Sequence, residues 1–238
     1  MSLEVPLSEA PWTGPEPEFA VVAARPVRYA AAPMLSLDLQ VSEPGGRQVY
    51  MIALHIQLMI EPARRGYDEA TRTKLLELFG EPERWAVTTR SLVWTQLDVL
   101  VPAFTGTTTV AVPVACSYDL ELAAAKYLYS LPDGMAPLAL HFNGTIYYRD
   151  EDGGLQMVLV PWNKSIDFRM PVSVWRETIE HYYPGTGWAA FGADTLAALQ
   201  RAKLDRGLAT LDATVAALLG EVEAGQAGEA DEAGEAQP

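Results

Sequence analysis

The fold of this chain is decided by residues 49–61, VYMIALHIQLMIE. Every second residue of this stretch is a large aliphatic one, and the positions between them are mixed. Successive side chains of a β-strand point to opposite faces, so the alternation predicts a long strand with one wholly apolar face. That face consists of Ile52, Leu54, Ile56, Leu58 and Ile60.

The same alternation continues on both sides of this strand. Further strands are predicted over residues 35–41, 91–104, 107–115, 138–148, 155–162 and 166–170. The turn sequence Glu43-Pro44-Gly45-Gly46 predicts that strand 35–41 pairs with strand 49–61 as a hairpin. Pro113 lacks a backbone N–H, which predicts an edge or bulged position for strand 107–115.

Helical periodicity interrupts and then follows the strands. Inserted helices are predicted over residues 68–79, with Asp68 as cap, and over residues 117–131. Three more helices are predicted after residue 172. The strands occur in groups rather than one per helix, and this disfavours a Rossmann-type fold. We therefore predict the α+β class: an antiparallel β-sandwich or strongly curved sheet of about seven strands, with inserted helices and a C-terminal helical segment.

Composition suggests four segments. Residues 1–27 form a proline-rich arm, for which Trp12 and Phe19 are the bulky anchors. Residues 28–172 form the antiparallel β domain with its inserted helices, and residues 173–220 form helices packed on it. Residues 221–238 are an acidic Ala/Gly/Glu tail that buries too little apolar area to offset its chain entropy, so we predict disorder there.

Charge and hydropathy exclude several classes of function. The formal net charge of −14 repels phosphate backbones, so nucleic-acid binding is not expected. No signal peptide is recognisable, and no apolar run approaches the roughly 18 residues of a membrane-spanning helix. We expect a cytoplasmic protein without membrane association.

The reactive side chains are few and scattered. The chain has three histidines and one cysteine, and none lies in an HxH, HxxxH or CxxC spacing. A metal site needs three or four ligands at compatible spacing, so we predict no metal, no cofactor and no catalytic residue. Cys116 shares the inward face of its strand with Val112 and Val114, which favours a small buried side chain. His55 is interpreted as a partly exposed sheet residue, and His181 as a cation in the last turn of a helix.

One polar row is the best candidate for a binding surface. His141, Asn143 and Thr145 alternate along one strand face, which is either an ordinary solvated face or the lining of a groove. Trp94, Gln96 and Asp98 are predicted to share one face of a second strand.

Tryptophan is the second candidate feature. Trp162, Trp175 and Trp188 lie close to the helical segment in the sequence. They either fasten a helix to the sheet or form an exposed patch that recognises a partner. The candidate surface as a whole comprises Trp94, Gln96, Asp98, His141, Asn143, Thr145 and Trp162.

Several segments resemble a bacterial family of unknown function that is typical of high-GC genomes. The resemblance covers roughly residues 11–208, and its segments are PWTGP at 11–15, IEPARR at 60–65, LFGEPERW at 78–85, VPAFTG at 101–106, AAKYL at 124–128, VPW at 160–162 and YPGTGW at 183–188. The resemblance implies a gene neighbourhood shared with nickel–iron uptake hydrogenases. The resemblance therefore implies an accessory role whose partner is a redox enzyme subunit.

Three hypotheses about function follow. The first is a non-enzymatic accessory or interaction protein that presents an aromatic or strand-edge surface to another protein. The second is an enzyme or small-ligand-binding protein that uses the polar strand face around His141, with Trp94, Gln96 and Asp98 on a shared concavity. The third is an export-chaperone-like protein whose curved sheet binds unfolded chains.

Overall fold

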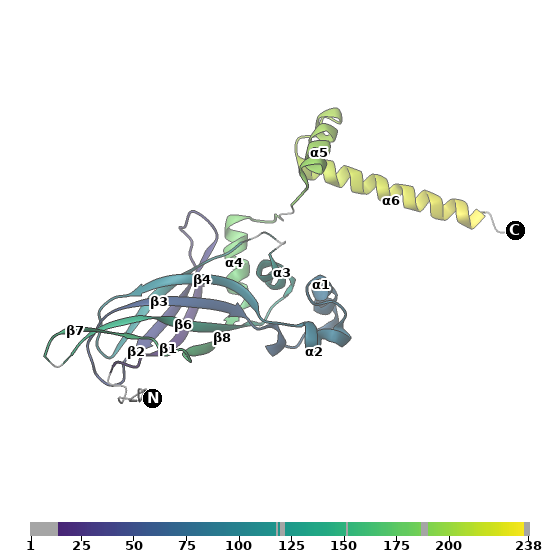
Figure 1. Cartoon of the computed structure of the whole chain (residues 1–238). Coiled ribbons are helices and arrows are strands. Elements are labelled where there is room, and N and C mark those ends of the chain that lie inside the picture. The colour runs from purple at the N-terminus through teal and green to yellow at the C-terminus, as the bar shows by residue number, and fades with distance from the viewer. Residues whose placement is uncertain (1–13, 118, 120–121, 151, 187–189, 236–238) are drawn as a thin grey trace, which may run out of the picture. The chain divides into compact units, whose positions relative to one another are not determined.

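The computed structural model describes residues 14–117, 119, 122–150, 152–186 and 190–235. The chain divides into two compact units, Met1–Trp188 and Ala189–Pro238. The first unit holds the β-structure and the candidate surface, and the second is helical. Figure 1 shows the elements of both units.

Eight strands form two antiparallel sheets in the described part of the first unit. The three-stranded sheet has the order β1-β2-β5, and its strands are β1 (Glu18–Pro26), β2 (Met34–Ser42) and β5 (Thr107–Ala115). The five-stranded sheet has the order β4-β3-β6-β7, and β8 also pairs with β6. Its strands are β3 (Val49–Ile60), β4 (Leu92–Val101), β6 (Met135–Arg149), β7 (Leu155–Leu159) and β8 (Ser165–Pro171).

The two sheets enclose one hydrophobic core. The predicted aliphatic face of β3 is buried along its whole length, and the inward residues of β2 and β5 belong to the same cluster. Phe19 of β1 stacks on Phe142 of β6, with ring centroids 4.3 Å apart, and so joins one sheet to the other. The α+β class predicted from the sequence is confirmed, and the arrangement is a sandwich of two sheets.

The predicted hairpin between strands 35–41 and 49–61 is wrong. β2 pairs with β1 and β5, whereas β3 pairs with β4 and β6. The connection after β2 crosses to the other sheet beside the connection after β4, and the Glu43 backbone N–H donates to the Gly106 carbonyl at 2.6 Å. The alternating pattern fixes which face of a strand is buried, but it does not choose the neighbouring strand.

β5 pairs only with β2 among the described strands, so it lies at an edge as Pro113 predicts. β6 and β7 are consecutive in the chain and pair antiparallel with each other. β8 begins where β7 has ended, and both follow β6 along the same side.

The helices of the first unit gather at the end of the sandwich away from β7 (Figure 1). They are η1 (Pro62–Arg64), α1 (Glu69–Phe79), η2 (Pro82–Arg84), α2 (Trp85–Thr88), α3 (Ala123–Ser130) and α4 (Val172–Tyr182). α1 begins as predicted, because the Asp68 carboxylate accepts a hydrogen bond from the Thr71 backbone N–H at 2.8 Å. α3 is shorter than the predicted helix over residues 117–131.

A pair of tyrosine hydroxyls links the inserted helices. The Tyr67 hydroxyl donates to the Pro62 carbonyl at 2.7 Å and lies 2.8 Å from the Tyr127 hydroxyl. Tyr67 therefore has no proton left for Tyr127, and the Tyr127 hydroxyl donates to Tyr67. Burial raises the pKa of both phenols, so both are neutral hydrogen-bonding groups of the core.

Two predicted segment boundaries change. Residues 18–26 of the predicted arm form β1, and Phe19 anchors them, while Trp12 lies outside the described residues. Of the helices predicted to pack on the β domain, only α4 belongs to the first unit, where Val172, Trp175 and Ile179 enter the core. The β domain thus begins earlier than expected and includes one C-terminal helix.

The second unit contains α5 (Ala193–Asp205) and α6 (Leu211–Glu235). Arg206 forms an ion pair with Glu221, at 2.6 Å between Nη1 and Oε1. α6 continues through residues 221–235, which the sequence analysis predicted to be disordered. Alanine and glutamate are strong helix formers, and extending an existing helix costs far less than starting one.

Candidate functional site

The outer face of the five-stranded sheet carries most of the residues singled out in the sequence. The register places successive rows of outward side chains across β4, β3, β6 and β7. One row runs from Leu100 through Ala53 and Thr145 to Leu159, and the next row contains Asp98, His55 and Asn143. The polar predicted residues of β4 and β6 therefore share one face, with β3 between them.

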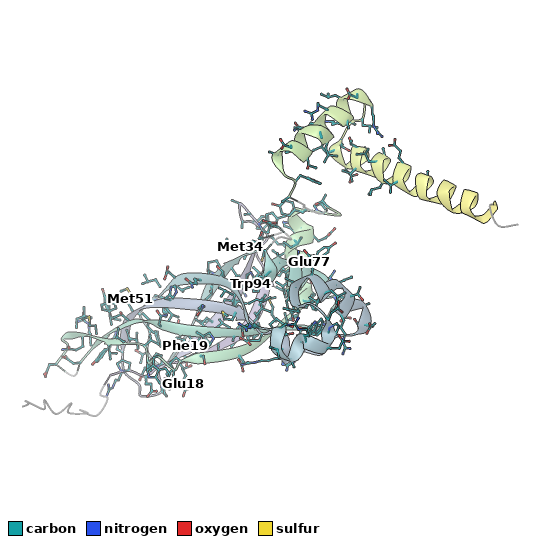
Figure 2. All side chains as sticks on the ribbon, turned by 45° about the vertical axis from the view of Figure 1, so that its right-hand side comes forward. Glu18, Phe19, Met34, Met51, Glu77 and Trp94 are labelled. Carbon is teal, nitrogen blue, oxygen red and sulfur yellow. The ribbon has the colours of Figure 1, made fainter. Side chains whose placement is uncertain are left out.

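One half of this face is apolar. Leu155, Met157 and Leu159 are all the outward residues of β7, and they are 56%, 72% and 69% exposed. Leu100 of β4 is 62% exposed on the same face. We define the apolar patch as Met51, Ala53, Leu100, Tyr147, Leu155, Met157 and Leu159. In Figure 2, Met51 marks the end of the sheet where this patch lies, and Trp94 marks the opposite end.

The other half is polar. We define the polar row as His55, Gln57, Gln96, Asp98, His141 and Asn143, which the register brings together across β4, β3 and β6. Nδ1 of His55 lies 2.9 Å from Oδ1 of Asp98. The Asp98 side chain is 90% exposed, so the pair is in contact with water. Solvent weakens such an ion pair. Thr145 lies at the boundary between the two halves.

Trp94 does not lie with Gln96 and Asp98, contrary to the prediction. A β-bulge shifts the register between Leu58/Thr95 and Met59/Val93. The extra residue in the bulge is Trp94, which packs against the core instead. Alternation counted along the sequence fails at such a position, because a bulge changes which face each later residue occupies.

The tryptophans divide between the two roles considered for them. Trp175 of α4 is 2% exposed and fastens that helix to the core. Trp162, in the corner between β7 and β8, is 93% exposed. Trp188 lies outside the described residues. The aromatic candidate that remains available to a partner is therefore Trp162, next in the chain to the apolar patch.

Cys116 and His181 support the fold and do not lie on the candidate surface. Cys116 is buried, as its alternation with Val112 and Val114 predicts. His181 lies in the last turn of α4, and its Nε2 is 3.0 Å from the Arg28 carbonyl oxygen. The Tyr182 hydroxyl contacts the same connection between β1 and β2, at Ala30. The end of α4 thus holds this connection in place, a role that the sequence did not reveal.

The buried thiol leads to a testable prediction. Burial raises the pKa of Cys116 to about 12, from an ordinary value of 9.0. At pH 8 the thiolate fraction should be about a thousandfold smaller in the folded chain than in the unfolded chain, and alkylation by iodoacetamide should slow accordingly. Between pH 9 and pH 12 the unfolded chain loses this proton first, so stability should fall as pH rises. Rapid alkylation of the folded protein at pH 8 would contradict the burial of Cys116.

The described residues meet the requirements of neither a metal site nor a membrane-spanning helix, although they line a hollow. No three His, Cys, Asp or Glu side chains gather closely enough there to hold a metal ion. No described helix combines the length and hydrophobicity that crossing a bilayer requires. A hollow of about 650 Å³ lies beside α4, and its walls include Arg28, Arg176, Glu177 and Glu180. Both signs of charge line that hollow, so its chemistry selects no class of ligand.

A solved structure from Bordetella pertussis assigned as an ApaA protein is similar with a TM-score of 0.27 and 12% identity, and the match covers 66% of this chain and 95% of that one. A structural genomics target designated SoR45 is similar with a TM-score of 0.23 and 7% identity, covering 74% of this chain and 94% of that one. No curated protein matches significantly. Residues 14–227 match DUF6084, described as a family of unknown function, and the chain belongs to that family.

Proposed function

We propose that this chain is a non-enzymatic interaction protein that binds another protein through the apolar patch. The observation that carries the proposal is the exposure of Leu100, Met157 and Leu159 on one continuous sheet face. Exposed apolar side chains that lie together in a patch are typical of interaction sites. Full burial of each such side chain is worth about 1.5–3 kcal/mol, part of which offsets the cost of association.

The surroundings of the patch support the same proposal. The polar row borders it on one side, as a polar rim borders the apolar centre of a protein interface. Trp162 is an exposed aromatic residue three positions after Leu159 in the chain, and tryptophan is enriched among residues that dominate binding energy. The His55–Asp98 pair is open to water, which suits a rim better than a reaction site.

The class of partner is proposed from the resemblance described above. We take a subunit of a nickel–iron uptake hydrogenase as the first partner to test, with the chain acting as an accessory protein in the cytoplasm of a high-GC bacterium. The apolar patch would then bind that subunit as a folded protein. The acidic character of the chain, with a net charge of −14, adds a preference for partners with a basic rim.

The test compares two equivalent substitutions in the full chain. Leu100→Glu places a charge in the apolar patch, and Val87→Glu places the same charge on a 72% exposed residue of α2 outside the patch. We expect Leu100→Glu to weaken binding to purified hydrogenase subunits at least tenfold and Val87→Glu to leave it unchanged, measured by biolayer interferometry. Equal binding by both variants would exclude the patch, and absence of binding by the unmodified chain would exclude this partner.

The same variants address the chaperone hypothesis. An export-chaperone-like protein should suppress aggregation of a chemically denatured client, and Leu100→Glu should abolish this effect. Binding of a folded hydrogenase subunit without any effect on the denatured client would support the accessory role. Protection of the client without binding of the folded subunit would replace the accessory role with the chaperone role.

A second candidate function rests on the polar row. Gln96, Asp98, His141 and Asn143 share one face, as the small-ligand hypothesis requires, and a shallow hollow lies around His55 and Asp98. A small polar ligand bound there should raise the unfolding temperature of the unmodified chain. It should not raise that of the His141→Ala variant, whose side chain is exposed and outside the core.

A further inference from the structure

β7 has one free edge in the described part of the five-stranded sheet. Among the described strands, β7 pairs with β6 alone. The Asp150 N–H donates to the Gly154 carbonyl at 2.9 Å, and the Val160 N–H donates to the Gly144 carbonyl at 3.0 Å. In an antiparallel pair the residues that exchange hydrogen bonds alternate. The even-numbered residues of β7 therefore face β6, and its odd-numbered residues direct their N–H and C=O groups to the open edge.

This edge lacks the usual protection against pairing. Natural edge strands are guarded by charged residues, proline or bulges, because their unpaired backbone groups attract another strand. β7 has the sequence LQMVL, with no charged residue, no proline and no bulge in its pairing with β6. The described residue Gly14 lies against the Val158 side chain, which points to the inner face. Residues 155, 157 and 159, whose backbone groups face the open edge, are also the residues whose side chains lie on the outer face.

The three outward residues of β7 form a palindrome, because they have the same order of residue types when read from either end of the strand. Leucine, methionine and leucine stand at 155, 157 and 159, so a two-fold axis through Met157 places Leu155 of one copy opposite Leu159 of the other. Met157 then lies opposite itself. These pairs are hydrogen-bonded pairs, because all three residues present their backbone groups to the edge. A two-fold interface requires a surface that is complementary to itself, and this strand meets that requirement.

We propose that β7 pairs antiparallel with β7 of a second copy of this chain, about a two-fold axis at Met157. The side chains of Leu155, Met157 and Leu159 stay on the outer face, so two apolar patches join into one surface. The dimer and the partner binding proposed above are separate events, one at the strand edge and the other on the sheet face.

Disulfide cross-linking tests the position of the axis. Paired residues of this kind have Cα atoms about 5.5 Å apart, within the range that a disulfide bridges. Met157→Cys should therefore form covalent dimers on mild oxidation at least tenfold more than Leu100→Cys, which lies on the same face in β4, at the opposite side of the sheet from β7. The native Cys116 is buried and does not compete. Leu155→Cys should also cross-link poorly, because its counterpart in the second copy is residue 159. Equal cross-linking at 155 and 157, or none above the Leu100→Cys level, would overturn the proposal.

A second measurement uses the unmodified chain and one edge variant. Sedimentation of the unmodified chain at rising concentration should approach twice the chain mass of 25.9 kDa. Met157→Pro removes a backbone N–H that β6 does not use, so the ladder to β6 survives while dimerisation should weaken at least tenfold. Met157→Lys provides the same test if the proline variant fails to fold. A monomer at all concentrations would overturn the dimer and leave the Leu100→Glu test of partner binding intact.

Discussion

Replacing Gly144 by alanine should cause the largest loss of stability of any single substitution considered for this protein. Gly144 lies within β6, opposite Leu54 of β3, with a backbone φ of 144°. A Cβ atom there would lie 2.1 Å from the Ala53 carbonyl oxygen, which is a backbone atom of the central strand. The strand pair must separate to accommodate it, so we expect a loss of roughly 4 kcal/mol or more, in the range reserved for the most damaging substitutions. Chemical denaturation followed by circular dichroism measures the loss.

Gly153→Ala is the matched control for this prediction. Gly153 also has a positive φ, of 80°, but a Cβ atom there meets nothing within 4 Å. Its replacement should cost only about 1–2 kcal/mol, the penalty for a side chain in the left-handed region. Equal losses for the two variants would show that β3 and β6 do not approach as closely as the structure has it.

Phe142→Ala should cause the second largest loss. Phe142 is buried in β6 and stacks on Phe19 of β1, so it fills the space between the two sheets. Truncation of a buried phenylalanine costs about 3–5 kcal/mol through lost burial and the remaining cavity. Leu159→Ala, at an exposed position of the same sheet, should change stability by less than about 0.5 kcal/mol.

A double-mutant cycle isolates the contact between the sheets. Phe19→Ala, Phe142→Ala and the double variant should show a coupling of about 0.5–1.5 kcal/mol, which is the range for aromatic pairs. Additive losses would mean that the two rings contribute separately to the core. Because Phe19 lies in the segment that the sequence suggested to be an arm, the coupling also measures how firmly β1 belongs to the sandwich.

The candidate surface could be predicted only in part. The alternation in β6 placed His141, Asn143 and Thr145 on one face, and the structure has them there. The partner residues on β4 and β3 depend on strand order, which local alternation does not contain. Trp94 left the predicted face because one bulge residue changed the count. The apolar patch was missed, because Leu155, Met157 and Leu159 alternate like core residues and nothing local distinguishes an outward from an inward apolar face.

The sequence by itself determined seven of the eight described strands, most of their inward faces, the start of α1 and the absence of any spacing typical of a metal site. These features depend on neighbours within a few residues, where side-chain period, capping and turn geometry act directly. Only the tertiary structure decided which strands pair, that β1 forms one edge of the smaller sheet, and that the outer face of β7 is exposed to solvent. Those outcomes depend on contacts between residues far apart in the chain, whose energies no local pattern records.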